Sequence, residues 1–466
     1  MFVNREDEIK ALEDRWQSKK AEFAVLYGRR RVGKTELIEH FIKNKKGIRL
    51  LCRTESEKDQ LKRFSINLSD FFNDAFIKIN PFQNWDAFFS YLSDKAKNEK
   101  FILAIDEFPY LIDSNKAIPS ILQDYWDRFL KDSRIFLILC GSSISMMTEK
   151  VLGHNSPLYG RRTSQMKIET MKFINIGKFY KNFDIKELIY TYSILGGTPG
   201  YLLEFNDKEN IFENIKNKFL RKDSFLYQDA EFILKEELNE PKFYFSILKA
   251  IALGKTKLGD IINETGLDKS IISKYLSVLI ELDMIKREVP ITEKHPYKSR
   301  KGIYLLKDNF YKFWFSFIFP NMEEIEMTKS DLIIENKIKP HLDLYTSKIF
   351  ENICKELIWK LKLFNYDSVG KWWNNKSEID ITAINTKDKK ILFGECKWQE
   401  NVSPYSVLNN LKEKLPFVDW NNEDRKEYYI IFAKSFSKRV ELDNLYLFDL
   451  NDIGKLIKSP SINSSN

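Results

Sequence analysis

The stretch GRRRVGKT, residues 28–35, holds two glycines, a lysine and a threonine at a spacing suited to phosphate binding. Gly28 and Gly33 allow the backbone to fold tightly around phosphate oxygens, with its N–H groups pointing inward. A helix that begins near Lys34 would direct its positive end at the same anion. Lys34 would then contact the β- and γ-phosphates, and Thr35 would bind Mg²⁺. The chemistry expected here is the binding of a nucleoside triphosphate.

A pair of carboxylates follows in the order that such a loop requires. The run FILAIDEF, residues 101–108, is an apolar strand that ends in Asp106 and Glu107. Asp106 would complete the Mg²⁺ shell, and Glu107 would orient or deprotonate the attacking water. The sequence therefore predicts that ATP is bound and hydrolysed. The residues expected around ATP through these two motifs are Gly28, Arg29, Arg30, Arg31, Val32, Gly33, Lys34, Thr35 and Asp106.

Two neighbouring segments leave alternatives open. The strand in RIFLILCGSS ends in hydroxyl residues, so Ser142 or Ser143 would either sense the γ-phosphate or simply form a turn. In SPLYGRRT, Arg161 or Arg162 would contact the nucleotide or a neighbouring subunit, or would lie in a solvated loop.

A second candidate site lies in a hairpin near the end of the chain. In SEIDITAIN, alternation places Asp380 on one face of a strand and Ile379 and Ile381 on the other. In the next strand, ILFGECKW, Glu395 and Lys397 share a face. This part of the sequence therefore offers two acids and a lysine on adjacent strands.

The register of this hairpin would bring the acids together. If residues 386–389 form the turn, Asn385 pairs with Lys390 and Asp380 falls opposite Glu395. Facing carboxylates repel each other. A divalent cation between them makes their interaction energy favourable, because hard cations bind carboxylate oxygens. A lysine two residues further on would hold the attacking water or the scissile phosphate. The pattern favours a metal-dependent nuclease site with Mg²⁺ or Mn²⁺, and the alternative is a retained fold that does not cleave.

The elements that must position these residues follow from the hydrophobic pattern. Apolar runs near 24–27, 101–108 and 134–143 alternate with helical segments, which predicts an α/β core with a parallel sheet. We expect this P-loop core to span residues 1–165. Residues 166–240 have a helical pattern without catalytic spacing, and we expect them to form a lid.

A winged helix is expected within residues 241–325. Residues 256–289 indicate helix, turn, helix and strand. The polar side chains expected to point outward from the second helix are Lys269, Ser273, Lys274 and Ser277. The wing, residues 286–308, has seven basic and three acidic residues, which favours contact with DNA phosphates. Packing within the protein is the alternative.

Four segments together resemble the archaeal-type ATPases of the STAND branch, which is related to AAA+ proteins. They are FVNRE at the start, YGRRRVGKTEL, AIDEF and GGTPGYL. The resemblance extends to about residue 290 and implies a P-loop core with a helical lid and winged helix. It also implies that Phe2 and Arg5 lie on the adenine side of the nucleotide, and that Gly197 and Pro199 contact it from the lid.

Residues 330–458 resemble the PD-(D/E)xK nuclease-like domain that is fused to such ATPases. This resemblance implies an α/β fold of the restriction-endonuclease type. The residues it places in the metal site are Glu351, Asp380, Glu395 and Lys397, with Glu378 as an alternative acid. No proline precedes Asp380, where the name pattern has one, and many members also lack it. Residues 459–466 are expected to be a disordered tail.

Length and composition limit the number of domains and the kinds of partner that the chain can have. A chain of 466 residues is too long for a single core and suggests about three domains. The net charge of +8 permits nucleic-acid binding without requiring it. Four scattered cysteines without a CxxC pair fit the cytoplasm better than a disulfide framework or a zinc site. The run at 313–319 is far shorter than the ~20 residues of a membrane span, so no membrane partner is expected.

The sequence leaves the function of the whole chain between alternatives. One is an ATP-regulated enzyme that acts on DNA through a metal-dependent nuclease domain. The other is a STAND-type ATP switch whose winged helix and C-terminal domain bind DNA or a protein partner without cleavage. A third is a transcription regulator that acts through the winged helix. Homo-oligomerisation is compatible with each of them.

Overall fold

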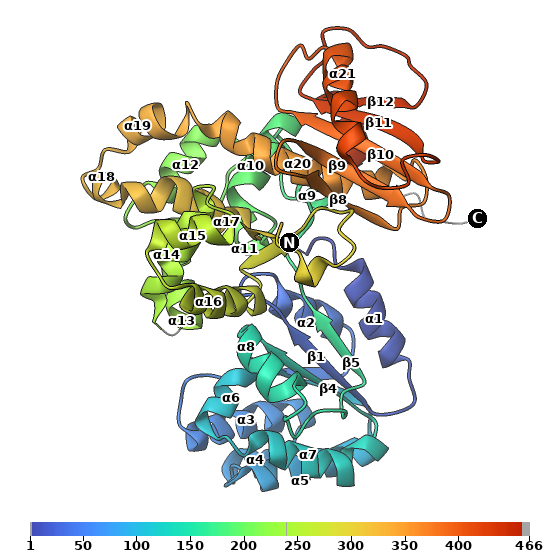
Figure 1. Cartoon of the computed structure of the whole chain (residues 1–466). Coiled ribbons are helices and arrows are strands. Elements are labelled where there is room, and N and C mark those ends of the chain that lie inside the picture. Colours follow the sequence, from blue (N-terminus) through green and yellow to red (C-terminus); the bar gives the residue numbers. More distant parts are fainter. Residues whose placement is uncertain (1, 239, 459–466) are drawn as a thin grey trace. The chain divides into compact units, whose positions relative to one another are not determined.

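The computed structural model describes residues 2–238 and 240–458, and the chain divides into two compact units with the boundary after Thr170. The first unit is built on a five-stranded parallel sheet in the order β2-β3-β4-β1-β5 (Figure 1). Its strands are β1 (Glu22–Tyr27), β2 (Gly47–Leu51), β3 (Phe101–Asp106), β4 (Ile135–Gly141) and β5 (Ser164–Lys167). Its helices are α1 (Glu6–Trp16), α2 (Lys34–Ile42), α3 (Glu57–Phe72), α4 (Ala75–Ile79), α5 (Trp85–Asn98), α6 (Phe108–Ser114), α7 (Ile118–Arg128) and α8 (Ile144–Met146).

Helices cover both faces of this sheet, as the apolar strands require. On one face, Val25 and Leu103 join a core cluster with residues of α3, α5 and α7. On the other face, Leu26 and Ala104 pack with residues of α1 and α2. The strand order makes β4 the neighbour of both β1 and β3, so the carboxyl ends of these three strands lie at one edge. The predicted α/β core is confirmed.

The first half of the second unit is helical and contains a two-stranded wing. Its helices are α9 (Phe173–Ile176), α10 (Ile185–Leu195), α11 (Pro199–Leu202), α12 (Ile211–Phe219), α13 (Phe225–Glu237), α14 (Pro241–Ala252), α15 (Leu258–Thr265), α16 (Lys269–Glu281), α17 (Asn309–Phe313), α18 (Met322–Glu326) and α19 (Ser330–Ile333). The antiparallel strands β6 (Ile285–Glu288) and β7 (Ile303–Leu306) form the wing after α16. This is the helix-turn-helix and wing that the sequence predicts.

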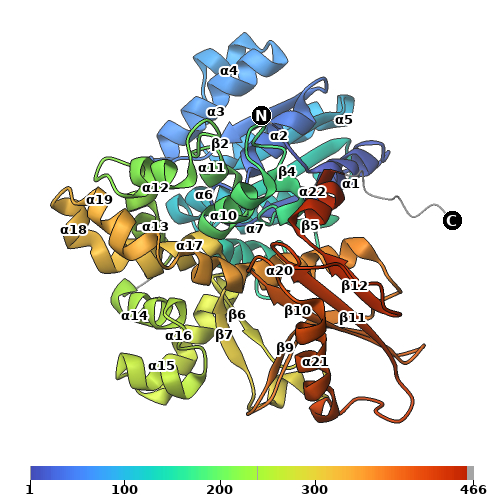
Figure 2. The same ribbon diagram turned by 90° about the horizontal axis from the view of Figure 1, so that it is seen from above.

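The second half of this unit is a mixed five-stranded sheet in the order β12-β11-β10-β9-β8 (Figure 2). Its elements are α20 (Leu342–Leu361), β8 (Ser368–Trp373), β9 (Glu378–Asn385), β10 (Lys390–Lys397), α21 (Pro404–Lys414), β11 (Lys426–Ala433), β12 (Leu445–Phe448) and α22 (Leu450–Lys458). Leu392 of β10 packs in the cluster that includes α20, whereas Phe393 packs with Leu411 of α21. The two helices therefore cover opposite faces of the sheet.

Within the described residues, no helix is long and apolar enough to cross a membrane. The four cysteines are free and buried.

Candidate nucleotide site and carboxylate–lysine cluster

The backbone of the glycine-rich loop depends on its two glycines. Gly28 has a φ of 152°, and a Cβ there would lie 2.3 Å from the carbonyl oxygen of Ile168. Gly33 has a φ of 91° and caps the N-terminus of α2, with no atom within 4 Å of a Cβ. A side chain at Gly28 would thus displace backbone, whereas one at Gly33 would add only conformational strain. Helix α2 begins at Lys34, as predicted.

Lys34 points into the loop that precedes it. Its Nζ donates to the carbonyl oxygens of Gly28 and Arg29, each at 2.9 Å. The side chain is buried, and burial lowers the pKa of Lys34. The loop therefore holds a desolvated cation whose present acceptors are backbone carbonyls, which phosphate oxygens can replace with stronger, charge-assisted bonds.

Thr35 and Asp106 lie side by side. The Thr35 hydroxyl donates to Asp106 Oδ2 at 3.0 Å, and Asp106 is 1% exposed at the end of β3. Arg49 of β2 also contacts Asp106 Oδ2, at 3.2 Å. A hydroxyl and a carboxylate are hard oxygen donors of the kind that Mg²⁺ prefers, so these two residues fit the expected metal. Arg49 was not predicted, because a single arginine on a neighbouring strand carries no motif.

Glu107 lies in a strained turn and accepts hydrogen bonds from Ser142, the residue that follows β4. Its φ is 54°, a left-handed value that is uncommon for a non-glycine residue. Its Oε2 accepts hydrogen bonds from the backbone N–H of Ser142, at 3.1 Å, and from its hydroxyl, at 2.8 Å. Of the two serines considered, Ser142 is therefore the one beside Glu107, whereas Ser143 caps the short helix α8. Strain of this kind is typical of functional positions.

The N-terminal segment reaches the loop through Arg5. Its guanidinium donates to the carbonyl oxygens of Val32, at 2.8 Å, and Glu169, at 2.7 Å, and pairs with Glu8 at 2.8 Å. Phe2 stacks on the His40 ring of α2 with centroids 4.0 Å apart. Both residues thus lie beside the loop and its helix, and their contact with adenine stays a prediction.

Three further arginines considered for the nucleotide site contact other residues of the protein. Arg30 donates to the Tyr110 hydroxyl at 3.1 Å, and Arg161 pairs with Asp127 of α7 at 3.0 Å. Arg162 bonds to Gln165 within its own segment. Contacts of these three arginines with a nucleotide stay predictions.

The predicted lid contact lies in the second unit. Pro199 begins α11, and Gly197 is packed so closely that a Cβ would lie 1.8 Å from the carbonyl oxygen of Met171. The contact of Gly197 and Pro199 with a nucleotide therefore stays a prediction.

The C-terminal hairpin has the predicted register. Asn385 pairs with Lys390, and the ladder runs to Ile381 opposite Gly394. The expectation that Ile379 and Ile381 share a face is wrong. Ile379 packs in the cluster with α21, and Ile381 packs in the cluster with α20. The cause is a register shift between β8 and β9 opposite this segment, because such a bulge turns side chains to the other face.

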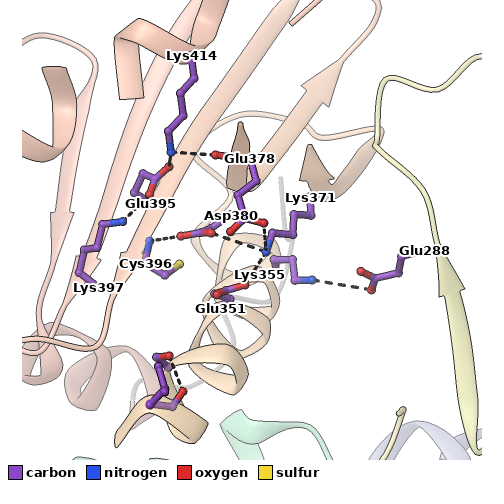
Figure 3. Close-up of polar contacts among 12 residues, drawn as sticks. Glu288, Glu351, Lys355, Lys371, Glu378, Asp380, Glu395, Cys396, Lys397 and Lys414 are labelled. Atoms are coloured by element: carbon purple, nitrogen blue, oxygen red, sulfur yellow. Dashed lines mark hydrogen bonds and ion pairs between the residues drawn. The ribbon is translucent and has the colours of Figure 1, made fainter. Parts of the chain in front are cut away.

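Lysines occupy the spaces between the predicted acids (Figure 3). The Nζ of Lys371, on β8, lies 3.0 Å from Glu351 Oε2, 3.3 Å from Glu378 Oε2 and 3.9 Å from Asp380 Oδ1. Burial lowers the pKa of Lys371, but Glu351, Glu378 and Asp380 outweigh it and raise the pKa above its usual range. This lysine was not predicted as a site residue, although it lies in the GKWW stretch that precedes the hairpin.

Glu395 is held by two further lysines. Its side chain is 4% exposed, and its oxygens lie 2.7 Å from Lys397 Nζ and 2.6 Å from Lys414 Nζ. Burial alone would lower the pKa of Lys397, but Glu395 raises it. Lys414 comes from α21 and was not predicted, since a helix that follows the hairpin by several residues gives no local signal.

Asp380 lies buried beside other acids of the cluster. Its Oδ2 accepts a hydrogen bond from the backbone N–H of Cys396 at 3.0 Å. Burial, and then repulsion from Glu351 and Glu395, raises the pKa of Asp380 to about 7. Even so, no three acidic, histidine or cysteine side chains among the described residues are arranged to hold a metal ion. The predicted ligands Glu351, Asp380 and Glu395 are near one another, but this arrangement directs them at lysines and does not fit a metal.

The winged helix has an exposed polar face and a packed wing. The polar side chains exposed on α16, as predicted, are Lys269, Ser273, Lys274 and Ser277. Ile271 of the same helix is also exposed. In the wing, the backbone N–H of Ile291 donates to the carbonyl oxygen of Lys371 at 2.9 Å, and its side chain packs near Trp372. This segment of the wing therefore packs internally, as one alternative expected. Lys298, Arg300 and Lys301 of the wing are exposed, and their contact with DNA stays a prediction.

Comparisons with known proteins agree with this architecture. A model of an ATPase domain predominantly from Archaea matches residues 2–205. A model of archaeal and bacterial proteins of unknown function matches residues 314–413, and one of bacterial regulatory proteins of the arsR family matches residues 246–287.

Individual proteins are similar over different lengths. An uncharacterised protein of Methanocaldococcus jannaschii is 38% identical over 464 residues, which cover 97% of this chain and 100% of that protein. An uncharacterised ATP-binding protein of the same organism is 59% identical over 46 residues, 10% of this chain and 78% of that protein. A Walker-type ATPase of Pyrococcus abyssi shares the fold, with a TM-score of 0.51 and 20% identity over 67% of this chain and 96% of that chain.

The parallel sheet, the loop that follows β1 and the archaeal ATPase match agree on one class, and the protein is a P-loop ATPase. It belongs to the family of the Methanocaldococcus jannaschii protein, with which it aligns over nearly its whole length.

Proposed function

We propose that ATP binds at Gly28–Thr35 and is hydrolysed with the help of Asp106 and Glu107, and that the nucleotide state controls a C-terminal domain that acts on DNA. The observation that carries the ATPase part is the contact of Thr35 with Asp106, which joins the phosphate loop to the carboxylate strand at 3.0 Å. The exposed polar face of α16 and the match to regulatory proteins support DNA as the partner.

The first steps of the proposed mechanism are exchanges of hydrogen-bond partners. Lys34 gives up the carbonyl oxygens of Gly28 and Arg29 and binds phosphate oxygens instead, which costs little because the loop already desolvates its ammonium group. Thr35 and Asp106 would hold Mg²⁺, which neutralises charge on the phosphates when bound. Arg49 keeps the Asp106 carboxylate oriented toward Thr35.

Glu107 is proposed to orient the attacking water. Its Oε2 is occupied by Ser142, so the other carboxylate oxygen is the one that can accept a proton from water. The left-handed backbone at Glu107 and the Ser142 contacts together fix the direction of the side chain. Ser142 is then a positioning residue for hydrolysis.

The C-terminal cluster is proposed as the nuclease site, with Asp380, Glu395 and Lys397 as its reactive groups and Glu351 as a further acid, which Lys371 holds in this structure. The support is the raised pKa of Asp380, since a buried acid beside two others is typical of functional sites. The specific observation that favours the alternative, an ATP switch without cleavage, is that each of these acids contacts a lysine. Cytoplasmic location and assembly with a protein partner or a second copy remain part of the proposal.

The deciding experiment is a cleavage assay on linear, nicked and single-stranded DNA with Mg²⁺ or Mn²⁺, with and without ATP. The parent is compared with Lys397→Ala, Lys34→Ala and Lys390→Ala. Lys390 is the matched control because it lies on the same strand as Lys397 and pairs with a carboxylate, Asp388, outside the cluster.

The proposal expects cleavage by the parent and by Lys390→Ala, loss in Lys397→Ala, and loss of the ATP effect in Lys34→Ala. Absence of cleavage on every substrate, with ATP hydrolysis intact, would establish the switch without a nuclease.

A further inference from the structure

Lys371 takes the central place that a cation would take among three carboxylates. Glu351 comes from α20, and Glu378 and Asp380 come from β9, so the acids reach the ammonium group from two different elements. The contact with Asp380 is the longest of the three, at 3.9 Å, whereas Glu351 is held at 3.0 Å. The carboxylates are thus gathered around one positive charge already supplied by the chain.

The wing fixes the backbone from which this lysine projects. The N–H of Ile291 donates to the carbonyl oxygen of Lys371 itself. The Ile291 side chain lies so close to Gly370 that a Cβ there would contact it at 3.2 Å. The same segment of β8 is where the pairing with β9 changes register, between Gly370 and Trp372. The position of Lys371 therefore depends on the wing as well as on its own strand.

A second contact ties the wing to the same helix. Glu288, at the end of β6, lies 2.5 Å from Lys286 and 4.0 Å from Lys355 of α20. Lys355 is one helical turn from Glu351, the acid that Lys371 holds most closely. Displacement of the wing would therefore disturb both sides of the cluster.

We propose that Lys371 is a built-in competitor for a divalent cation in the carboxylate cluster, and that the wing keeps it there through Ile291. Withdrawal of β8 from the wing would move the ammonium group away and leave Glu351, Glu378 and Asp380 facing one another. Carboxylates that share one site without a cation repel one another, so a hard divalent ion would replace the lysine. This inference rests on the proposed function of the cluster and adds a mode of regulation to it.

The first test is Mn²⁺ binding to the full chain, followed by the electron paramagnetic resonance signal of free Mn²⁺, without DNA or nucleotide. Lys371→Gln removes the charge and keeps hydrogen-bond donors, and we expect it to tighten Mn²⁺ binding on the order of tenfold or more. Lys390→Gln removes a charge from the same sheet outside the cluster and should bind as the parent does. Lys371→Arg keeps the charge and should also behave as the parent.

The second test addresses the wing and leaves every charge in place. Ile291→Ala removes the side chain that packs beside Gly370, and we expect it to increase Mn²⁺ affinity by a smaller factor than Lys371→Gln. Ile303→Ala is the matched control, since Ile303 lies on β7 of the same wing and pairs with Glu288 and Lys257. Circular dichroism confirms that each variant is folded.

Two results would overturn the inference: a folded Lys371→Gln with the Mn²⁺ affinity of the parent, or an Ile291→Ala that does not differ from Ile303→Ala. Failure of the proposed function is a separate result. Tighter Mn²⁺ binding in Lys371→Gln without DNA cleavage would support the competitor role and reject the nuclease. Cleavage by the parent, with unchanged Mn²⁺ binding in Lys371→Gln, would support the nuclease and reject the competitor role.

Discussion

Replacement of Arg5 by methionine should loosen the phosphate loop from outside the motif. Arg5 is buried, and its guanidinium connects the carbonyl oxygens of Val32 and Glu169 with the carboxylate of Glu8. Methionine preserves much of the apolar stem but donates no hydrogen bond. The variant therefore leaves the carbonyl of Val32, inside the loop, without this donor.

The size of the effect follows from these contacts. A hydrogen bond from a charged group contributes about 1.5–3 kcal/mol, and here one such bond holds the loop directly. If its loss makes the binding-competent loop a minor population, the apparent affinity falls in proportion to that population. A change of about 1.4 kcal/mol is tenfold, so we expect ATP to bind about tenfold to a hundredfold more weakly.

The assay is a titration of each variant with ATP and Mg²⁺ by isothermal calorimetry. Arg15→Met is the matched control, because Arg15 also lies near the start of the chain and pairs with a glutamate, Glu22, at 3.0 Å. The Arg15 guanidinium is directed at Glu22 of β1, so its variant should bind ATP as the parent does. A folded Arg5→Met with the same ATP affinity as Arg15→Met would refute the view that Arg5 preorganises the loop.

Three other perturbations test separate features. Glu107→Gln should keep ATP binding and slow hydrolysis at least about a hundredfold in a phosphate-release assay, and turnover equal to the parent would reject its role. Gly28→Ala should abolish ATP binding because its Cβ would meet the carbonyl of Ile168 at 2.3 Å, whereas Gly33→Ala, with open space around it, should lose less; equal losses would contradict this. Burial lowers the pKa of Lys312 to about 8. The charged form of Lys312 therefore destabilises the fold below that pH. This loss of stability disappears as the pH rises toward the ordinary lysine pKa of about 10.4. Lys312→Met should therefore raise the melting temperature most near neutral pH, with the gain shrinking between about pH 8 and 10, and a gain independent of pH would rule out this cause.

The parts of the fold that were predictable are those with local backbone requirements. The start of α2 at Lys34 and the end of β3 at Asp106 were correct, because glycine conformation, strand burial and helix onset act within a few residues. The hairpin register was correct for a similar reason, since a short turn between Asn385 and Lys390 determines every pair that follows.

Contacts set by distant elements were not predictable. Lys371 and Lys414 reach the acids from an edge strand and a later helix, and neither stands at a spacing from them that defines a motif. The face of Ile379 was wrong because alternation assumes an unbroken ladder, and a single extra residue reverses it. Arg49 shows the same limit in the nucleotide site, where only the sheet order brings β2 beside Asp106.

Helix α20 explains why the second unit packs as one body although its sequence predicts a lid, a winged helix and a C-terminal domain. Glu356 accepts hydrogen bonds from the backbone N–H groups of Phe173 and Ile174, at the start of the predicted lid. About three helical turns toward the N-terminal end of α20, Tyr345 donates to the carbonyl oxygen of Ser193 at 2.8 Å. The same helix presents Glu351 to Lys371 and covers one face of the C-terminal sheet.

A helix that shares its surface among all three segments cannot shift for one of them alone, because packed interiors rearrange between discrete states and do not deform continuously. We therefore expect a movement of the predicted lid to reach the carboxylate–lysine cluster through α20, which would be the physical link for the proposed coupling between ATP and the C-terminal domain.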